Sequence, residues 1–190
     1  MPTMTGRFDA AFAYAHEAHA AQTRKGNGMP YLGHLMGVAS IVIDDGGTED
    51  EAIAALLHDA AEDQGGRPRL DDIRTRFGDA VAAIVEDCTD PWTHPKAPWE
   101  ERKQRYVAHA RTLSPASLRV SAADKVHNAY AILRDLRNVG DQVWERFNAN
   151  ADDILAYYQS LVRAYRDAGG GRLVDEHDRI VRAIEREMGY

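Results

Sequence analysis

Four side chains suited to binding a divalent metal ion are spread over the first two thirds of the chain: His34, His58, Asp59 and Asp124. Two imidazoles and two carboxylates make a mixed nitrogen and oxygen ligand set, which Mn²⁺, Fe²⁺, Mg²⁺ and Zn²⁺ can all accept. Four protein ligands on a six-coordinate ion would leave positions for water and a substrate. Such an ion lowers the pKa of water and polarises a phosphoryl oxygen.

Two further carboxylates, Glu62 and Asp63, lie one turn beyond the adjacent His–Asp pair. They are placed to orient a water molecule or to move its proton. The alternative interpretation is a surface helix with a solvated acidic face. The same face continues back through Ala52 and Ala55, where a solvated face would usually carry charged residues.

A single buried histidine is more often a hydrogen-bonded core residue than a metal ligand. Five other histidines receive that interpretation: His16, His19, His94, His109 and His177. The combination of two histidines with two aspartates, rather than any one of them, favours a metal site.

Helices are expected to position these groups. The segment 48–63 is predicted to be a single helix that begins with a capping box, because Thr48 is followed three residues later by Glu51. A second helix carries His34 on the same face as Val38, so the imidazole should point inward.

Asp124 and Asn128 lie one turn apart on a long, weakly charged helix. Ser114 and Pro115 fit the N-cap and first position of that helix, which is predicted to run to about Arg137. A carboxylate buried there needs a partner, since an isolated one would be driven to its neutral form.

The rest of the chain also reads as helix. The inner face of a first helix is predicted to carry Phe8, Phe12, Ala15 and His19. Gly65 to Pro68 is predicted to be a loop. Residues 89–98 contain three prolines, cannot form a regular helix, and are a candidate flap over the site. A last amphipathic helix is expected in 170–190, after a run of glycines.

Composition limits the functional classes. The 190 residues suit one all-α domain, 1–190, and the net charge of −7 argues against a general binder of nucleic acids or anionic membranes. The single cysteine, Cys88, excludes an intramolecular disulfide and a thiolate zinc site. We see neither a signal peptide nor a transmembrane segment, so a cytoplasmic location is expected.

An ordered set of motifs resembles a known family. The motifs are Arg24-Lys25-Gly26, Pro30-Tyr31-Leu32-Gly33-His34, Leu56-Leu57-His58-Asp59-Ala60-Ala61-Glu62-Asp63, Arg76-Phe77-Gly78 and Ala123-Asp124-Lys125-Val126-His127-Asn128. They resemble the HD-domain phosphohydrolase superfamily and, within it, the hydrolase domain of the RelA/SpoT family. The stand-alone small alarmone hydrolases are the most similar group, and the likeness runs from about residue 8 to residue 165.

The resemblance implies an all-helical HD-domain fold with Mn²⁺ bound by His34, His58, Asp59 and Asp124. It implies that Glu62 and Asp63 serve the nucleophilic water. The implied reaction removes the 3′-pyrophosphate of the alarmone (p)ppGpp and gives GDP or GTP and pyrophosphate. The implied substrate contacts are guanine stacking by Arg24, phosphate binding by Lys25 and Lys103, and nucleoside binding by Asn128.

Two rival functions remain open at this stage. One is an HD-domain phosphohydrolase that acts on another nucleotide, such as a deoxynucleotide or NADPH. The other is a non-catalytic nucleotide-binding module that keeps a metal for folding, against which the Glu62–Asp63 pair weighs. The expected partner is a small nucleotide, with a homodimer as a candidate assembly, and neither a nucleic-acid polymer nor a membrane is expected.

Overall fold

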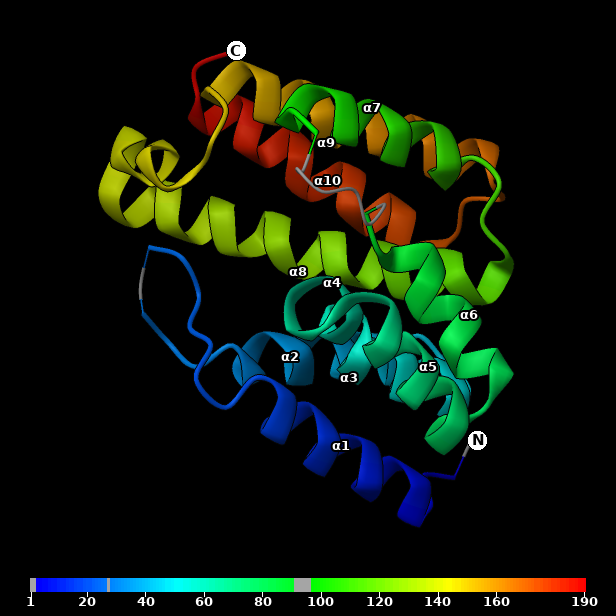
Figure 1. Cartoon of the computed structure of the whole chain (residues 1–190). Coiled ribbons are helices and arrows are strands. Elements are labelled where there is room, and N and C mark those ends of the chain that lie inside the picture. Colours follow the sequence, from blue (N-terminus) through cyan, green and yellow to red (C-terminus); the bar gives the residue numbers. More distant parts are fainter. Residues whose placement is uncertain (1–2, 27, 91–96) are drawn as a thin grey trace.

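The computed structural model describes residues 3–26, 28–90 and 97–190, and these residues form helices with no β-sheet (Figure 1). This confirms the all-α prediction. The elements in chain order are α1 (Gly6–Ala18), α2 (Leu32–Asp44), α3 (Glu49–Leu57), α4 (Ala60–Gln64), α5 (Gly66–Phe77), α6 (Asp79–Cys88), α7 (Trp99–Ala110), α8 (Pro115–Val139), the 3₁₀ helix η1 (Gly140–Arg146), α9 (Ala151–Asp167) and α10 (Arg172–Glu187).

Helix α8 runs through the middle of the molecule, with α1 to α5 on one side and α9 and α10 on the other (Figure 1). Its N-terminal half belongs to a first core cluster, built mainly from the buried apolar residues of α1 to α6. Its C-terminal half belongs to a second core cluster, with η1 and parts of α9 and α10. Asp124 lies where the two clusters meet, between Ala123 of the first and Val126 of the second.

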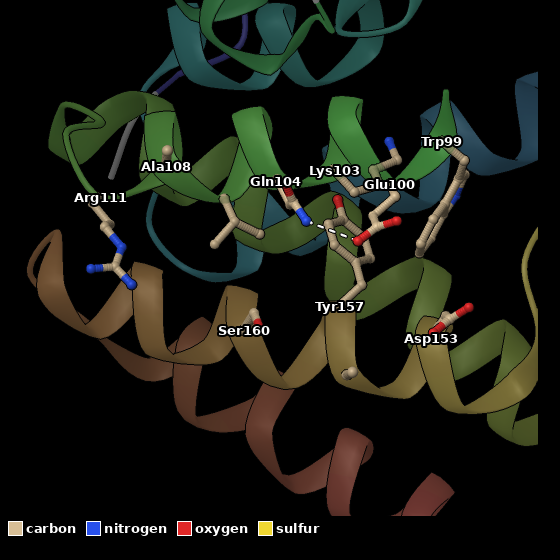
Figure 2. Close-up of a pocket in the computed structure, with 11 residues that line it drawn as sticks. Trp99, Glu100, Lys103, Gln104, Ala108, Arg111, Asp153, Tyr157 and Ser160 are labelled. Atoms are coloured by element: carbon tan, nitrogen blue, oxygen red, sulfur yellow. Dashed lines mark hydrogen bonds between the residues drawn. The ribbon is translucent and has the colours of Figure 1, made fainter. Parts of the chain in front are cut away.

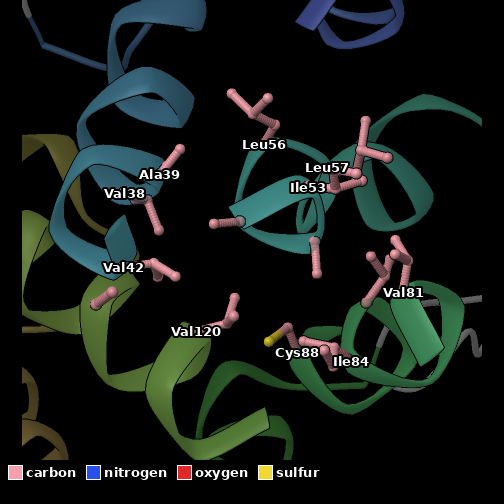
Figure 3. Close-up of a cluster of buried hydrophobic side chains, with 14 of the residues drawn as sticks. Val38, Ala39, Val42, Ile53, Leu56, Leu57, Val81, Ile84, Cys88 and Val120 are labelled. Atoms are coloured by element: carbon pink, nitrogen blue, oxygen red, sulfur yellow. The ribbon is translucent and has the colours of Figure 1, made fainter. Parts of the chain in front are cut away.

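The first core cluster fixes α2, α3 and α6 against α8. Figure 3 shows side chains of the four helices in this cluster, with Val42, Ile84 and Val120 around one space and Leu56 on the opposite side of α3. The same α2 and α3 carry His34 and, at the end of α3, His58. Apolar packing of these helices therefore sets the distance between the two imidazoles.

Local signals in the sequence explain several helix ends. The Thr48 side chain accepts from the N–H of Glu51, and the Glu51 carboxylate accepts from the N–H of Thr48 at 2.6 Å, which confirms the capping box. Ser114 caps α8 and Pro115 is its first residue, as predicted. Val139, rather than Arg137, ends that helix.

The predicted single helix over 48–63 was wrong in one respect. It is interrupted at His58 and Asp59, and Asp59 has φ −96° and ψ −5°, between the two helices. Adjacent residues on an unbroken helix point about 100° apart. The interruption instead brings the Nε2 atom of His58 within 3.0 Å of an Asp59 carboxylate oxygen.

Two smaller predictions also need correction. Pro68 is not in a loop but in the first turn of α5, where a missing N–H costs no helical hydrogen bond. Ala15 and His19 are buried on the inner face as predicted, but Phe12 is 38% exposed, and Ala11 and Tyr14 complete that face. Tyr14 takes the inner place because its hydroxyl group donates to Asp72 of α5 at 2.7 Å.

Two further predictions concern membrane-spanning segments and the flap. No helix in the described residues is long and apolar enough to cross a membrane. Most of the predicted flap, 91–96, lies outside the described residues, so its role stays a prediction.

Candidate active site

The four predicted metal ligands lie close together, with both histidines and Asp124 buried and Asp59 half-buried. The Nε2 atom of His34 lies 3.2 Å from Oδ1 of Asp124 and 3.6 Å from Oδ2 of Asp59. The Nε2 atom of His58 lies 3.0 Å from the same Asp59 oxygen and 3.6 Å from the same Asp124 oxygen. The donor atoms of His34, His58 and Asp59 all lie within 4.8 Å of one another, and Asp124 of α8 faces both imidazoles.

The donor set fits a cation. Both imidazoles are 1% exposed, and within the described part of the chain neither Nε2 atom has a hydrogen-bond partner. An unpaired buried nitrogen facing a carboxylate oxygen is unfavourable unless a proton or a cation lies between them. A divalent ion bound by His34, His58, Asp59 and Asp124 would satisfy all four groups at once.

The same arrangement governs the charges of the ligands in the absence of an ion. Burial alone would lower the pKa of His58, but the carboxylates of Asp59 and Asp124 raise that pKa well above its usual value. Burial would raise the pKa of Asp59, yet the charge of His58 holds it well below its usual value. A proton on His58 therefore takes the place that a cation would otherwise occupy.

A layer of neighbours orients the ligands. The Nδ1 atom of His58 donates to the carbonyl of Ala55 at 2.8 Å, which leaves Nε2 free to bind a metal. The hydroxyl group of Tyr31 donates to Asp59 at 2.5 Å. Asp124 accepts from the Asn128 amide at 2.6 Å and pairs with the half-buried Lys125 ammonium.

The two predicted catalytic carboxylates follow the ligands on α4. Glu62 accepts the backbone N–H of Asp90 at 3.2 Å, and Asp63 accepts the side-chain amide of Gln22 at 2.7 Å. Glu62 is half-buried, whereas Asp63 is exposed. Both lie one turn after Asp59, so they border the pocket from the same short helix.

Arg24 and Asn128, both predicted to bind substrate, are in direct contact. Nη2 of Arg24 donates to the side-chain oxygen of Asn128 at 2.8 Å. Arg24 lies on a loop that is closed by backbone hydrogen bonds, including Arg24 N–H to the Met29 carbonyl at 2.8 Å. Lys25 follows on the same turn and is exposed.

Lys103 approaches the site from α7. Its ammonium lies 3.1 Å from a carboxylate oxygen of Asp90, which also pairs with Arg102 at 2.5 Å. Asp90 is 3% exposed, and its backbone N–H is the group that Glu62 accepts. Asp90 thus joins the predicted phosphate-binding lysine to a predicted catalytic carboxylate.

A cavity of about 620 Å³ lies between α7 and α9 on the far side of Lys103. Figure 2 shows Lys103 on its wall, with the ammonium directed away from α9, beside Tyr157 and Trp99. The metal ligands do not line this cavity. The predicted metal site therefore lies outside this cavity.

Sequence reasoning missed four residues of the site: Tyr31, Asp90, Lys125 and His127. Three of them lie inside quoted motifs, so their proximity to a ligand was a usable signal. The sequence offered no comparable signal for Asp90. Among the histidines predicted to be hydrogen-bonded core residues, His19 is buried and its Nδ1 atom lies 2.7 Å from the Gln22 side-chain oxygen, as expected. His16 and His109 are exposed, contrary to expectation, and His94 lies outside the described residues.

Comparisons with known proteins agree with this site. The model of the HD domain family matches residues 11–155. Guanosine-3′,5′-bis(diphosphate) 3′-pyrophosphohydrolase MESH1 of Xenopus tropicalis is 40% identical over 134 residues, which cover 69% of this chain and 70% of that protein. The Homo sapiens protein of the same name is 39% identical over the same length and coverage.

A solved structure of a metazoan ortholog of SpoT, described as hydrolysing ppGpp and acting in starvation responses, superimposes with a TM-score of 0.77. The identity is 26%, and the match covers 96% of this chain and 97% of that chain. The fold, the family match and the close relatives agree: the chain belongs to the HD domain family.

Proposed function

We propose that this protein is a metal-dependent (p)ppGpp 3′-pyrophosphohydrolase. The observation that carries the proposal is the convergence of His34, His58, Asp59 and Asp124 beside two carboxylates and beside the Arg24–Asn128 pair. The relatives that carry this activity in their names, at 39–40% identity, support the choice of substrate.

Mn²⁺ is the ion we propose, bound by the two histidines and two aspartates. When bound, such an ion supplies Lewis-acid polarisation of a phosphoryl oxygen and a lowered pKa for water. The ligand set contains no sulfur, which favours Mn²⁺, Mg²⁺ or Fe²⁺ over ions that prefer thiolates.

In the proposed reaction, the oxygen of water forms a bond to the phosphorus of the 3′-pyrophosphate that is linked to the ribose. The bond from that phosphorus to the ribose 3′-oxygen breaks, and the products are GDP or GTP and pyrophosphate. Glu62 and Asp63 take up the proton of the attacking water. That proton is returned to the ribose oxygen as it leaves, so the carboxylates are regenerated and atoms and charge balance.

The cationic side chains hold the substrate. Arg24 lies beside Asn128 and presents a flat guanidinium on which guanine can stack. Lys25 is exposed on the same turn, and Lys103 reaches the site from α7, so the two ammonium groups can meet the phosphates. Local cations of this kind compensate for the net charge of −7 when the ligand is an anion.

The test is a nucleotide panel incubated with purified protein and Mn²⁺, with the products separated by chromatography. ppGpp should give GDP and pyrophosphate, while GDP, a deoxynucleoside triphosphate and NADPH should stay largely intact. Glu62→Gln should lower turnover by roughly 10²–10⁴, the scale of a general acid–base group, while metal content stays normal. Glu17→Gln, an exposed glutamate on α1, is the matched control.

Preferential cleavage of a deoxynucleotide or NADPH would replace the alarmone assignment with another HD-domain hydrolase activity. Nucleotide binding without any cleavage, in protein with a full equivalent of Mn²⁺, would favour the non-catalytic module.

A further inference from the structure

His127 joins the metal pocket to the nucleotide-binding residues. Its Nδ1 atom lies 2.9 Å from Nδ1 of His34 and 3.3 Å from Nη1 of Arg24. The rings of His127 and His34 meet edge to face, with their centroids 4.8 Å apart. One ring nitrogen of α8 therefore contacts both a predicted metal ligand and a predicted substrate-binding side chain.

Both neighbours of this nitrogen are hydrogen-bond donors. A guanidinium can only donate. His34 faces the other ligands through Nε2, so in its metal-binding tautomer the ring hydrogen lies on Nδ1. His127 must then accept through Nδ1, and an imidazole nitrogen has a single lone pair to offer. Two donors from separate functional groups thus share one acceptor.

Gly37 makes room for this arrangement. A Cβ atom at Gly37 would lie 2.4 Å from Nε2 and 2.5 Å from Cδ2 of His127. Glycine is among the poorest helix formers, and Gly37 lies inside α2, one turn after His34. By contrast, a Cβ atom at Gly33, in the same helix, would have no atom within 4 Å. The ring of His127 is therefore seated directly on the backbone of the helix that carries the metal ligand.

We propose that His127 is a positioning residue that orients His34 for the metal and links metal binding to nucleotide binding at Arg24. When a nucleotide engages the Arg24 guanidinium, the lone pair of His127 is left to His34, and the metal is held more tightly. Thermodynamic reciprocity requires that the metal strengthen nucleotide binding by the same factor. The linkage rests on the proposed role of Arg24, whereas the orientation of His34 does not.

The first measurement is Mn²⁺ affinity without nucleotide, by titration calorimetry and by electron paramagnetic resonance of free Mn²⁺. His127→Phe keeps a ring but removes the acceptor, and it should weaken Mn²⁺ binding by about 10–100-fold, as loss of such an outer partner usually does. His127→Asn places an oxygen near the former Nδ1 position and should restore most of the affinity.

The glycine pair provides a second and independent route. Gly37→Ala should weaken Mn²⁺ binding as His127→Phe does, because the new methyl group displaces the ring. Gly33→Ala should bind Mn²⁺ like the original protein. Thermal melts of every variant separate a lost contact from a lost fold. Unchanged Mn²⁺ affinity in folded His127→Phe and folded Gly37→Ala would overturn the positioning role.

Guanosine is the probe for the linkage, since it has a base for Arg24 but no phosphate to bind the metal. Saturating guanosine should tighten Mn²⁺ binding several-fold in the original protein and leave His127→Phe unaffected. An equal gain in both proteins, or no gain in either, would overturn the linkage. Loss of Mn²⁺ affinity in His127→Phe together with failure to cleave ppGpp in the original protein would retain the positioning role and reject the alarmone assignment.

Discussion

Replacement of His177 should make the protein less sensitive to acid. This histidine of α10 is fully buried between the rings of Tyr158 and Tyr165, with centroid distances of 5.5 Å and 6.1 Å. Neither of its ring nitrogens has a hydrogen-bond partner in the described residues. It is therefore a buried polar group without compensation, contrary to the expectation of a hydrogen-bonded core residue.

The size of the expected change in the free energy of unfolding follows from the pKa of His177. Burial, assisted by the positive charge of Lys125, lowers the pKa of His177 from 6.5 to about 3. Below pH 6.5 the unfolded chain takes up a proton that the folded protein does not, so stability falls with falling pH. Between pH 7.5 and pH 5 this difference amounts to about 2 kcal/mol, from roughly 1.4 kcal/mol for each pH unit below the unfolded pKa.

His177→Phe keeps an aromatic ring in the cluster and removes the titrating group. At pH 7.5 the variant should already be at least as stable, because an unpaired buried polar group costs about 1–3 kcal/mol. At pH 5 the difference in the free energy of unfolding between the variant and the original protein should be larger by about 2 kcal/mol. All other groups that titrate in this range are common to both proteins and cancel in the difference.

The assay is urea unfolding followed by circular dichroism at pH 7.5, 6.5 and 5, with a chelator present so that metal release does not contribute. His16→Gln is the control, since it removes an imidazole that is exposed on α1. An advantage of His177→Phe that is the same at pH 7.5 and pH 5 would show that His177 takes up a proton in the folded protein, and the reasoning would fail.

Three further changes test the packing and the pocket. Thr48→Ala removes half of the capping box and should lower the free energy of unfolding by about 1 kcal/mol in a urea titration. Ser121→Ala should cost about 1–3 kcal/mol in the same titration, because the buried hydroxyl groups of Tyr106 and Tyr165 both lose their partner, at 2.7 Å and 2.6 Å. Asp124→Asn should reduce bound Mn²⁺ well below one equivalent by elemental analysis, and a full equivalent would remove Asp124 from the ligand set.

The sequence predicted well what depends on neighbours along the chain. Apolar periodicity, the Thr48 capping box and the Ser114–Pro115 start define helices from contacts three or four residues apart. His34 points inward for the same reason, because its face of α2 is apolar.

Features that depend on distant contacts could not be predicted in this way. The break at His58 and Asp59 is visible only once other helices place ligands opposite it. Tyr31 reaches Asp59 across 28 residues, and His127 reaches His34 across 93. No periodicity in a single sequence encodes such pairs. The sequence shows that these residues stand near a ligand in their motifs, but it does not show which ligand each one contacts.

The position of Asp124 at the seam between the two core clusters has a consequence for cooperativity. His34, His58 and Asp59 come from helices of the first core cluster, whereas the segment of α8 after Asp124 belongs to the second. Parts of a protein with separate cores can open independently, as partial unfolding units. An ion held across the seam binds only when α8 is docked on α2 and α3, so it penalises every such opening by its own binding free energy. With the metal bound, the two core clusters would therefore unfold in a single cooperative transition.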